Sequence, residues 1–380
     1  MPVRATKRGA ERTPIGGDYD VLVCGASFAG LTVARELRGI RPHPPRVLVL
    51  DRYEIGERQT SACAAPTEWL RNLGLEASIR QTFGSLVVHT PRAHARWPLG
   101  WTFSTFDYRE LCDLLWAQRG AGTEFDTAKV EGRVGSVVRT DRGDVSAPLI
   151  VDALGWKRNL GANLVQPPNA RLSRGLEVHP AGTGEDLELW IDKRVIRAGY
   201  GWSFPAKDEL RVGVGSFDPF DHVKDPTVAL AADLGLPPDG YQGNWIPHRL
   251  RPAVEDGVFF VGDSAGHCLP VTAEGIRTAF YFGIALGREL RSVLEGRSTR
   301  EEALARYGEF SAAHRWKYEC MLEVQHLVPK LRPRLLDGMT RVFGRHAVSH
   351  WAFRHYLDIA PPSFALPAPP AGVPAAVAVA

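Results

Sequence analysis

The chain has 380 residues, of which 44% are hydrophobic and 23% charged, and its formal net charge is +3. These values are typical of a soluble globular protein of two or three domains, and they argue against a disordered chain, a collagen and a coiled coil. The net charge is too small to favour nucleic acid as a partner, and no apolar run of about 18 residues is present to span a membrane.

The five cysteines are scattered along the chain and form no CxxC pair. This pattern argues against a disulfide framework and against a structural zinc site. The basic residues near the N-terminus are not followed by an apolar segment, so we expect no secretory signal. Together these features predict a cytoplasmic protein in a reducing environment.

The predicted elements begin after a polar, basic segment at residues 1–17, which we expect to be disordered. Residues 18–24 end in an apolar run that predicts a buried strand, and a Gly-rich turn and a helix to about residue 37 follow. Residues 46–50 predict a second buried strand, which ends at Asp51. A strand–helix–strand unit of this kind is typical of a parallel, doubly wound sheet.

The later segments first predict antiparallel strands and then another buried strand followed by a helix. Residues 187–196 and 209–215 alternate like antiparallel strands, and residues 258–261 predict another buried strand. A helix is expected from about residue 274 to residue 294, and residues 301–327 predict one or two amphipathic helices. The expected fold is therefore α/β, with a doubly wound parallel sheet, an interrupting antiparallel sheet and C-terminal helices.

We expect the two sheets to form two domains that alternate along the chain. The parallel-sheet domain is predicted at residues 18–85, 106–155 and 251–300, the antiparallel-sheet domain at 86–105 and 156–250, C-terminal helices at 301–358, and a flexible Ala/Pro-rich tail at 359–380.

The first motif is GASFAG at residues 25–30, between the first strand and the first helix. Gly25 permits the tight turn and Gly30 lets the helix pack closely on the strand, while the helix N-terminus offers free N–H groups to a pyrophosphate. Asp51 is placed to bind a ribose hydroxyl. Ser27 replaces the usual second glycine. The pattern predicts a dinucleotide site, and the alternative is a Gly-rich turn without a ligand.

The second motif is GDSAGHCLPVTAEGI at residues 262–276, after a buried strand. Together with GASFAG it resembles the FAD-binding pair of glutathione-reductase-like flavoproteins, and more narrowly the p-hydroxybenzoate-hydroxylase fold. The resemblance implies that Asp263 holds the ribityl chain, and that Gly275 and Ile276 lie by the flavin ring, where the helix dipole stabilises negative charge. The cofactor-binding residues that it implies are Gly25, Ser27, Phe28, Ala29, Gly30, Asp51, Arg52, Gly262, Asp263, Pro270, Glu274, Gly275 and Ile276.

The third motif is YGWSFP at residues 200–205. It resembles the Y-x-W-x-F-P signature of the geranylgeranyl reductase family, in which these aromatic residues line the cavity for an isoprenoid chain. Tyr200, Trp202 and Phe204 alternate, so a strand would present all three on one side as an apolar wall. The alternative is plain core packing.

Cys63 stands where members of this family often carry a cysteine followed by glycines, although Ala64 and Ala65 follow here. The resemblance implies that Cys63 relays a proton near the flavin, and Tyr200 and Trp202 are the further catalytic candidates. The alternative is a small buried thiol. His346 and His350 have HxxxH spacing, but no HExxH glutamate lies between them, and we expect no metal.

The resemblance implies an FAD-dependent oxidoreductase that reduces carbon–carbon double bonds of an isoprenoid or similar apolar substrate, with hydride from flavin N5. The alternative is an FAD-dependent monooxygenase that hydroxylates an aromatic or polyketide-like substrate. Leu154 stands where hydroxylases of this fold carry an aspartate, and no lysine occurs between Lys7 and Lys129 to serve a halogenase. No second Gly-rich strand–helix–strand unit is present, so NAD(P)H or a reduced electron-carrier protein is the expected electron donor.

The expected partner is a small apolar substrate, with no nucleic acid and no obligate protein partner. Residues 330–346 mix arginines with leucine, valine and phenylalanine. They predict a surface helix that rests on anionic lipid, which would place the protein at the periphery of a membrane. The alternative is an ordinary charged, solvated face.

Overall fold

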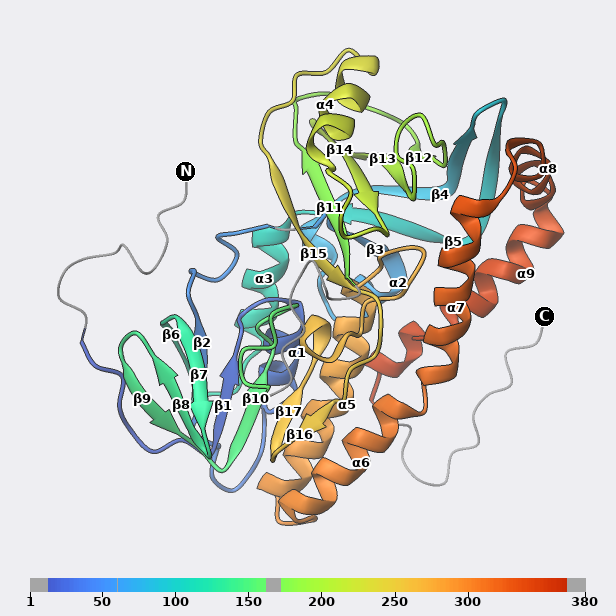
Figure 1. Cartoon of the computed structure of the whole chain (residues 1–380). Coiled ribbons are helices and arrows are strands. Elements are labelled where there is room, and N and C mark those ends of the chain that lie inside the picture. The colour runs from blue at the N-terminus through green and yellow to red at the C-terminus, as the bar shows by residue number, and fades with distance from the viewer. Residues whose placement is uncertain (1–12, 60, 162–171, 368–380) are drawn as a thin grey trace.

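The computed structural model describes residues 13–59, 61–161 and 172–367 of the chain. In this part, a six-stranded sheet lies at the lower left of Figure 1 and an eight-stranded sheet in its upper part. The six-stranded sheet has the order β16 (Val254–Glu255), β17 (Val258–Phe260), β10 (Leu149–Asp152), β1 (Val21–Cys24), β2 (Val47–Asp51) and β6 (Thr123–Thr127). All neighbours in it are parallel except β16 and β17. The expected doubly wound parallel sheet is thereby confirmed.

The eight-stranded sheet is mainly antiparallel, with one parallel pair between β12 and β4. Its order is β15 (Gln242–Pro247), β11 (Leu172–Val178), β14 (Glu209–Ser216), β13 (Gly199–Ala206), β12 (Leu187–Trp190), β4 (Ile79–Thr90), β5 (Ala93–Phe106) and β3 (Ala64–Pro66). A small third sheet contains β7 (Val130–Val134), β8 (Val137–Thr140) and β9 (Gly143–Ser146). The antiparallel interruption of the parallel sheet is therefore also confirmed.

The helices lie outside these sheets (Figure 1). They are α1 (Phe28–Glu36), α2 (Thr67–Asn72), α3 (Tyr108–Ala117), α4 (Lys224–Asp233), α5 (Ile276–Leu294), α6 (Arg300–Ala312), α7 (Arg315–Leu327), α8 (Pro333–Phe343) and α9 (His346–Leu357). The predicted helix at residues 301–327 is two helices, and Thr299 caps the first of them in a reciprocal pair with Glu302.

One strand is shorter than the alternation predicts. β12 ends at Trp190, whereas the pattern extends to residue 196. The reason is local, because the Asp192 carboxylate accepts a hydrogen bond from the Arg194 amide at 2.9 Å and turns the chain. The predicted domain boundaries remain a prediction. Residues 79–106 supply strands β4 and β5 of the eight-stranded sheet.

The predicted flexible tail is wrong for its first residues. Ala360 is fully buried, and its carbonyl oxygen accepts a hydrogen bond from the Trp69 indole at 3.0 Å. The Phe364 ring lies 4.4 Å from the Tyr281 ring between centroids. The apolar side chains among the prolines bury themselves on α2 and α5, and a reading of composition alone misses this. Residues 368–380 of the predicted tail and residues 1–12 of the predicted N-terminal extension lie outside the described residues.

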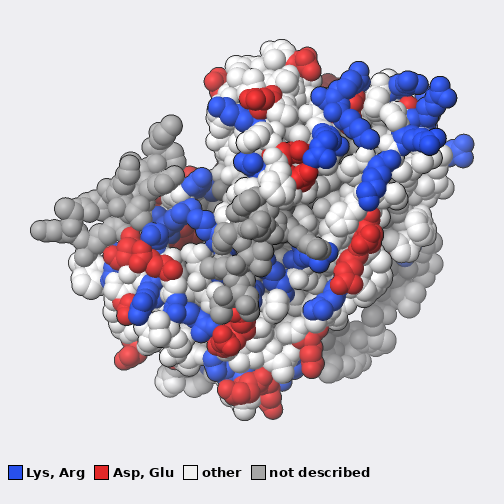
Figure 2. Space-filling view, in the orientation of Figure 1, with Lys and Arg blue, Asp and Glu red and all other residues white. Residues whose placement is uncertain are grey.

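Acidic and basic residues alternate over much of the face in Figure 2, but basic residues gather at its upper right, where Figure 1 places α8. No helix in the described part of the chain combines the length and the apolar character that crossing a bilayer needs.

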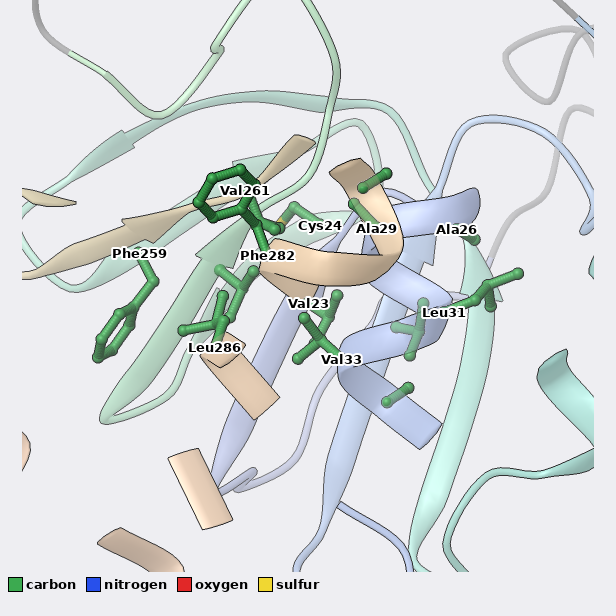
Figure 3. Packing of buried hydrophobic residues seen from close by; sticks show 14 of the residues in the cluster. Val23, Cys24, Ala26, Ala29, Leu31, Val33, Phe259, Val261, Phe282 and Leu286 are labelled. Atoms are coloured by element: carbon green, nitrogen blue, oxygen red, sulfur yellow. The ribbon is translucent and has the colours of Figure 1, made fainter. Parts of the chain in front are cut away.

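The main core lies between the six-stranded sheet and its helices. Figure 3 shows Leu31 and Val33 of α1 and Phe282 and Leu286 of α5 gathered with Val23 of β1 in one cluster. All four residues of β1 are buried, as its continuous apolar run predicts for a strand covered on both faces. The packing fixes the two helix N-termini at the same edge of the sheet, where the strands end.

Candidate functional site

The turn between β1 and α1 accepts only glycine at two positions. Gly25 has a φ of +115°, and a Cβ built there would lie 2.2 Å from the carbonyl oxygen of Ala153. A Cβ at Gly30 would lie 1.9 Å from the carbonyl oxygen of Gly25. Ser27 is the N-cap of α1, and its side chain makes no cap hydrogen bond, so the first amides of the helix stay available to a ligand.

Asp51 lies at the end of β2 beside this turn. Its carboxylate accepts hydrogen bonds from the amides of Ala26 at 2.9 Å and Tyr53 at 3.1 Å. Burial raises the pKa of Asp51, although these amides and Arg52 act against that shift. The Arg52 guanidinium itself stacks on the Tyr53 ring at 4.8 Å.

The two motifs predicted from the sequence meet in space. Gly262 and Asp263 follow β17 in a single 3-10 turn, and a Cβ at Gly262 would lie 3.0 Å from the Ala29 Cβ in the first turn of α1. A Cβ at Gly275, the N-cap of α5, would lie 3.6 Å from the Asp263 carboxylate. The turn at residues 25–30, Asp263 and the N-terminus of α5 therefore form one site.

No residue in the described part of the chain donates a hydrogen bond to the carboxylate of Asp263. Burial raises its pKa from 3.8 to about 6, and among the described residues only the more distant charge of Arg251 opposes this shift. A buried carboxylate without a hydrogen-bond donor is costly unless a ligand supplies one. The ribityl hydroxyls of FAD are such donors, and the glycine turn leaves room for its pyrophosphate, so the residues present fit FAD.

Ser27, which replaces the usual second glycine of the turn, contacts the start of α3. The hydroxyl of Tyr108 donates a hydrogen bond to the Ser27 hydroxyl at 3.1 Å. The Phe28 and Tyr108 rings lie 5.5 Å apart, edge to face. Ser27 and Tyr108 thus form one polar pair at the N-terminus of α1. No local pattern indicates that they meet, because 81 residues separate them.

The loop before α5 contains two residues with strained backbone angles and is held by three hydrogen bonds. Val271 and Ala273 adopt positive φ angles of 66° and 52°, which are costly for residues with a Cβ. The Tyr200 hydroxyl donates to the carbonyl oxygen of Thr272 at 2.8 Å, and the Tyr356 hydroxyl donates to the Thr272 hydroxyl at 2.8 Å. The Val271 amide donates to the side chain of Gln325 on α7 at 2.9 Å.

The Glu274 carboxylate is paired with neighbouring side chains. It pairs with both Nε and a terminal nitrogen of the fully buried Arg277, at 2.8 and 2.9 Å, and accepts a hydrogen bond from Tyr356. Arg277 also donates to backbone carbonyls of Leu357 and Ala360. Glu274 therefore connects the loop, which includes the buried Pro270, to the C-terminal helices.

The third motif forms the expected aromatic wall on β13. Tyr200, Trp202 and Phe204 are half-buried and alternate with the buried Gly201 and Ser203, so the three rings share one face of the sheet. A Cβ at Gly213 on β14 would lie 2.2 Å from the Trp202 indole, so this ring lies flat across its neighbour strand. Through Tyr200 the wall reaches the loop before α5.

A buried carboxylate that the sequence analysis missed lies beside this wall. Glu177 on β11 and Trp202 on β13 both pair with Gly213, so their side chains lie on the same face of the sheet. The Trp202 indole N–H donates to Glu177 Oε2 at 3.3 Å, and His179 Nε2 lies 2.9 Å from Glu177 Oε1. His179 Nδ1 lies 3.8 Å from the half-exposed Glu209, which gives a polar route toward solvent.

Cys63 lies against the same cluster. It is fully buried with a φ of 51°, and its carbonyl oxygen accepts a hydrogen bond from Arg211 at 3.1 Å. Burial raises the pKa of its thiol well above the ordinary value, Arg211 opposes this, and the charge of Glu177 adds to it. The thiol is therefore protonated at neutral pH.

The remaining histidine candidates have structural surroundings. His267 is fully buried, lies 3.0 Å from the Ser311 hydroxyl and stacks on Phe282. The rings of His346 and His350 stack 5.8 Å apart on α9. Within the residues described, no group of three or more potential metal ligands is found.

The raised pKa of Asp263 predicts that the free energy of unfolding of the flavin-free protein depends on pH. The ionised form is disfavoured by folding, so stability should fall as the pH rises from about 4 to about 6 and stay lower above that. Asp263→Asn should therefore stabilise the flavin-free protein at about pH 8 by at most about 3 kcal/mol, and by nothing near pH 4. Urea unfolding at both pH values measures this. Asp144→Asn, at an exposed position, is the control, and an equal gain at both pH values would contradict the expectation.

Comparisons with known proteins agree with this geometry. No family model matches the chain. It is 36% identical over 340 residues to digeranylgeranylglycerophospholipid reductase 3 of Methanosphaera stadtmanae, covering 78% of this chain and 83% of that one. The enzyme of that name from Sulfolobus acidocaldarius is 23% identical, over 78% of this chain and 72% of that one. The match to the Methanocaldococcus jannaschii enzyme, at 25% identity, spans 43% of that protein and 42% of this chain.

Solved structures show the same fold. A geranylgeranyl bacteriochlorophyll reductase-like protein from Thermoplasma acidophilum superposes with a TM-score of 0.78 at 18% identity, covering 91% of this chain and 97% of that one. A probable FAD-dependent monooxygenase from Pseudomonas aeruginosa gives a TM-score of 0.65 at 19% identity, over 85% of this chain and 99% of that one. With the two motifs joined in one site, these likenesses show that the chain belongs to the geranylgeranyl reductase family of FAD-dependent oxidoreductases.

Proposed function

We propose that this protein reduces carbon–carbon double bonds of an isoprenoid or similarly apolar substrate. The observation that carries the proposal is the aromatic wall of Tyr200, Trp202 and Phe204, which the Tyr200 hydroxyl joins to the loop before α5. Such a wall suits a long apolar chain. The names of the relatives, all reductases of geranylgeranyl lipids, point to the same substrate class.

We propose that FAD is held by the residues predicted for it, centred on Gly25, Gly30, Asp51 and Asp263. When bound, FAD supplies the hydride for the reduction. The N-terminus of α5 would stabilise negative charge near Gly275, and Ser27 with Tyr108 would contact the phosphates. NAD(P)H or a reduced electron-carrier protein remains our proposal for the electron donor.

Saturating a double bond adds a hydride to one carbon and a proton to the other, so the protein must also deliver a proton. We propose that Glu177 holds that proton and that His179 and Glu209 return another from solvent, since these groups lie in sequence from the wall to the surface. Trp202 fixes the carboxylate through its indole N–H. Cys63 is the alternative donor, because its thiol is protonated and lies against the same cluster.

The test is a single turnover without oxygen. The flavin of the purified protein is reduced with dithionite, a geranylgeranyl phospholipid is added, and reoxidation and the product mass are followed. We expect reoxidation with a gain of two hydrogen atoms for each double bond. A flavin that ignores the lipid, and instead consumes oxygen and hydroxylates an aromatic compound, would establish the monooxygenase; a protein without flavin would overturn both.

Trp202→Ala should separate substrate binding from cofactor binding. Losing the indole removes most of the wall, so kcat/KM for the lipid should fall by about 10- to 100-fold while the flavin content stays unchanged. The matched control is Trp316→Ala on α7, whose side chain is 63% exposed. An unchanged kcat/KM in Trp202→Ala would show that the wall does not bind the substrate.

A further inference from the structure

Helix α8 turns its apolar side to solvent. Leu335, Met339 and Val342 are 54%, 40% and 43% exposed, whereas Asp337 and Thr340 are buried. With 3.6 residues per turn, positions 335, 339 and 342 fall on one face of the helix, which we call the α8 stripe. A helix that packs on a protein core shows the opposite distribution, and the described part of the chain leaves the α8 stripe largely uncovered.

Hydrogen bonds to the eight-stranded sheet hold the helix in this orientation. The Thr90 hydroxyl donates to the Asp337 carboxylate at 2.7 Å, and the Trp97 indole donates to the Thr340 carbonyl oxygen at 2.9 Å. The Trp97 ring also lies 5.1 Å from the Phe343 ring. Rotating α8 to bury the α8 stripe would break both bonds and leave Asp337 without this partner.

Basic side chains surround the α8 stripe. Arg332, Arg334, Arg341 and Arg345 are all exposed, and none of the four forms an ion pair with another described residue. The one acidic residue of positions 330–346 is Asp337, which faces the sheet. Figure 2 shows the basic residues gathered at the upper right, over the region that α8 and the end of the β4–β5 pair occupy in Figure 1.

We propose that α8 is an interfacial helix that docks this protein on an anionic lipid bilayer. Leu335, Met339 and Val342 enter the boundary between headgroups and acyl chains, and the arginines attract the anionic headgroups. A second copy of this chain fits less well, because a symmetric contact through the α8 stripe would bring two sets of unpaired arginines together. The proposal rests on this surface alone and holds whichever apolar substrate the enzyme takes.

The test measures binding without turnover. The flavin-loaded protein is sedimented with vesicles of phosphatidylcholine, with or without a minor fraction of phosphatidylglycerol. We expect binding to the mixed vesicles to be about tenfold tighter than to pure phosphatidylcholine, and to weaken as salt is raised. No binding of the wild type to the mixed vesicles would overturn the proposal.

Two variants test the two components of the surface separately. One double variant, Leu335→Glu with Met339→Glu, introduces negative charge into the α8 stripe. The other, Arg334→Glu with Arg341→Glu, reverses the charge of two arginines beside it. Each should bind the mixed vesicles about tenfold or more weakly than the wild type. Phe220→Glu, at a side chain that is 66% exposed outside the C-terminal helices, should bind like the wild type. Circular dichroism and flavin content should be unchanged in all three.

Sedimentation velocity distinguishes the lipid from a second copy. We expect a species of the same size for the wild type and for the Leu335→Glu, Met339→Glu variant. A dimer that only the wild type forms, together with equal vesicle binding by both proteins, would assign the α8 stripe to self-association and overturn the proposal. Because no step of this experiment uses the lipid substrate, its outcome is independent of the double-bond reduction.

Discussion

Glu177→Gln is expected to lower the rate of lipid reduction by about 10²- to 10⁴-fold, the usual contribution of a positioned general acid. Glutamine keeps the size of the side chain and can still accept the Trp202 indole hydrogen bond, so the wall should keep its shape. It cannot supply a carboxyl proton. The measurement is the anaerobic single turnover, made at matched flavin content.

The control for this variant is another glutamate paired with a histidine in the same sheet. Glu188 on β12 lies 3.0 Å from His89 Nε2, but its strand partner is the buried Ser203 and not Trp202, so it lies on the other face. Glu188→Gln should reduce the lipid like the wild type. If Glu177→Gln keeps its rate and Cys63→Ala loses it, the proton comes from the thiol and the assignment to Glu177 is wrong.

Arg277→Met is expected to destabilise the protein by about 3–5 kcal/mol, because it leaves the Glu274 carboxylate buried without its counter-charge. It also removes the donors to the backbone carbonyls of Leu357 and Ala360, which hold α9 and the segment after it. For a chain of this length, the loss corresponds to a fall in Tm of roughly 5 °C. Thermal unfolding followed by flavin fluorescence and by circular dichroism measures it.

A second substitution separates the unpaired charge from the lost packing. Glu274→Gln combined with Arg277→Met should recover part of the loss, since no isolated carboxylate remains. Arg306→Met breaks an ion pair of Glu289 in which the arginine side chain is 44% exposed, and it should cost less than about 1 kcal/mol. Equal losses in Arg277→Met and Arg306→Met would show that the buried pair contributes no more than a surface pair.

Much of the fold follows from local sequence signals. The runs at residues 21–24 and 47–50 are apolar throughout, as a strand buried on both faces requires. Gly25 is needed for its positive φ, and Gly30 is needed for its close contact with the Gly25 carbonyl oxygen. Residues that meet these requirements occur at fixed spacings along the chain, so they can be recognised without a structure. The same holds for the alternating aromatic residues at 200–204.

Other features are fixed by contacts between distant segments. Residues 360–366 look like a flexible tail in composition, but Ala360, Pro362 and Ala365 are buried, and the segment contacts Trp69 of α2 and Tyr281 of α5. Glu177 looks like any strand glutamate, and nothing around it in the chain marks it as buried. Asp337 and Thr340 read as the solvent side of an amphipathic helix, yet they bind the sheet.

Local sequence signals specify the strand–turn–helix units, the glycine turn, the position of Asp263 and the aromatic side of β13. These features depend on backbone sterics and on the alternation of side chains, which act over a few residues. Long-range contacts bring Ser27 to Tyr108, place Glu177 beside Trp202 and turn the α8 stripe outward. Strand register and helix docking are set by packing between distant segments, and each residue contributes to it only in the presence of its partner.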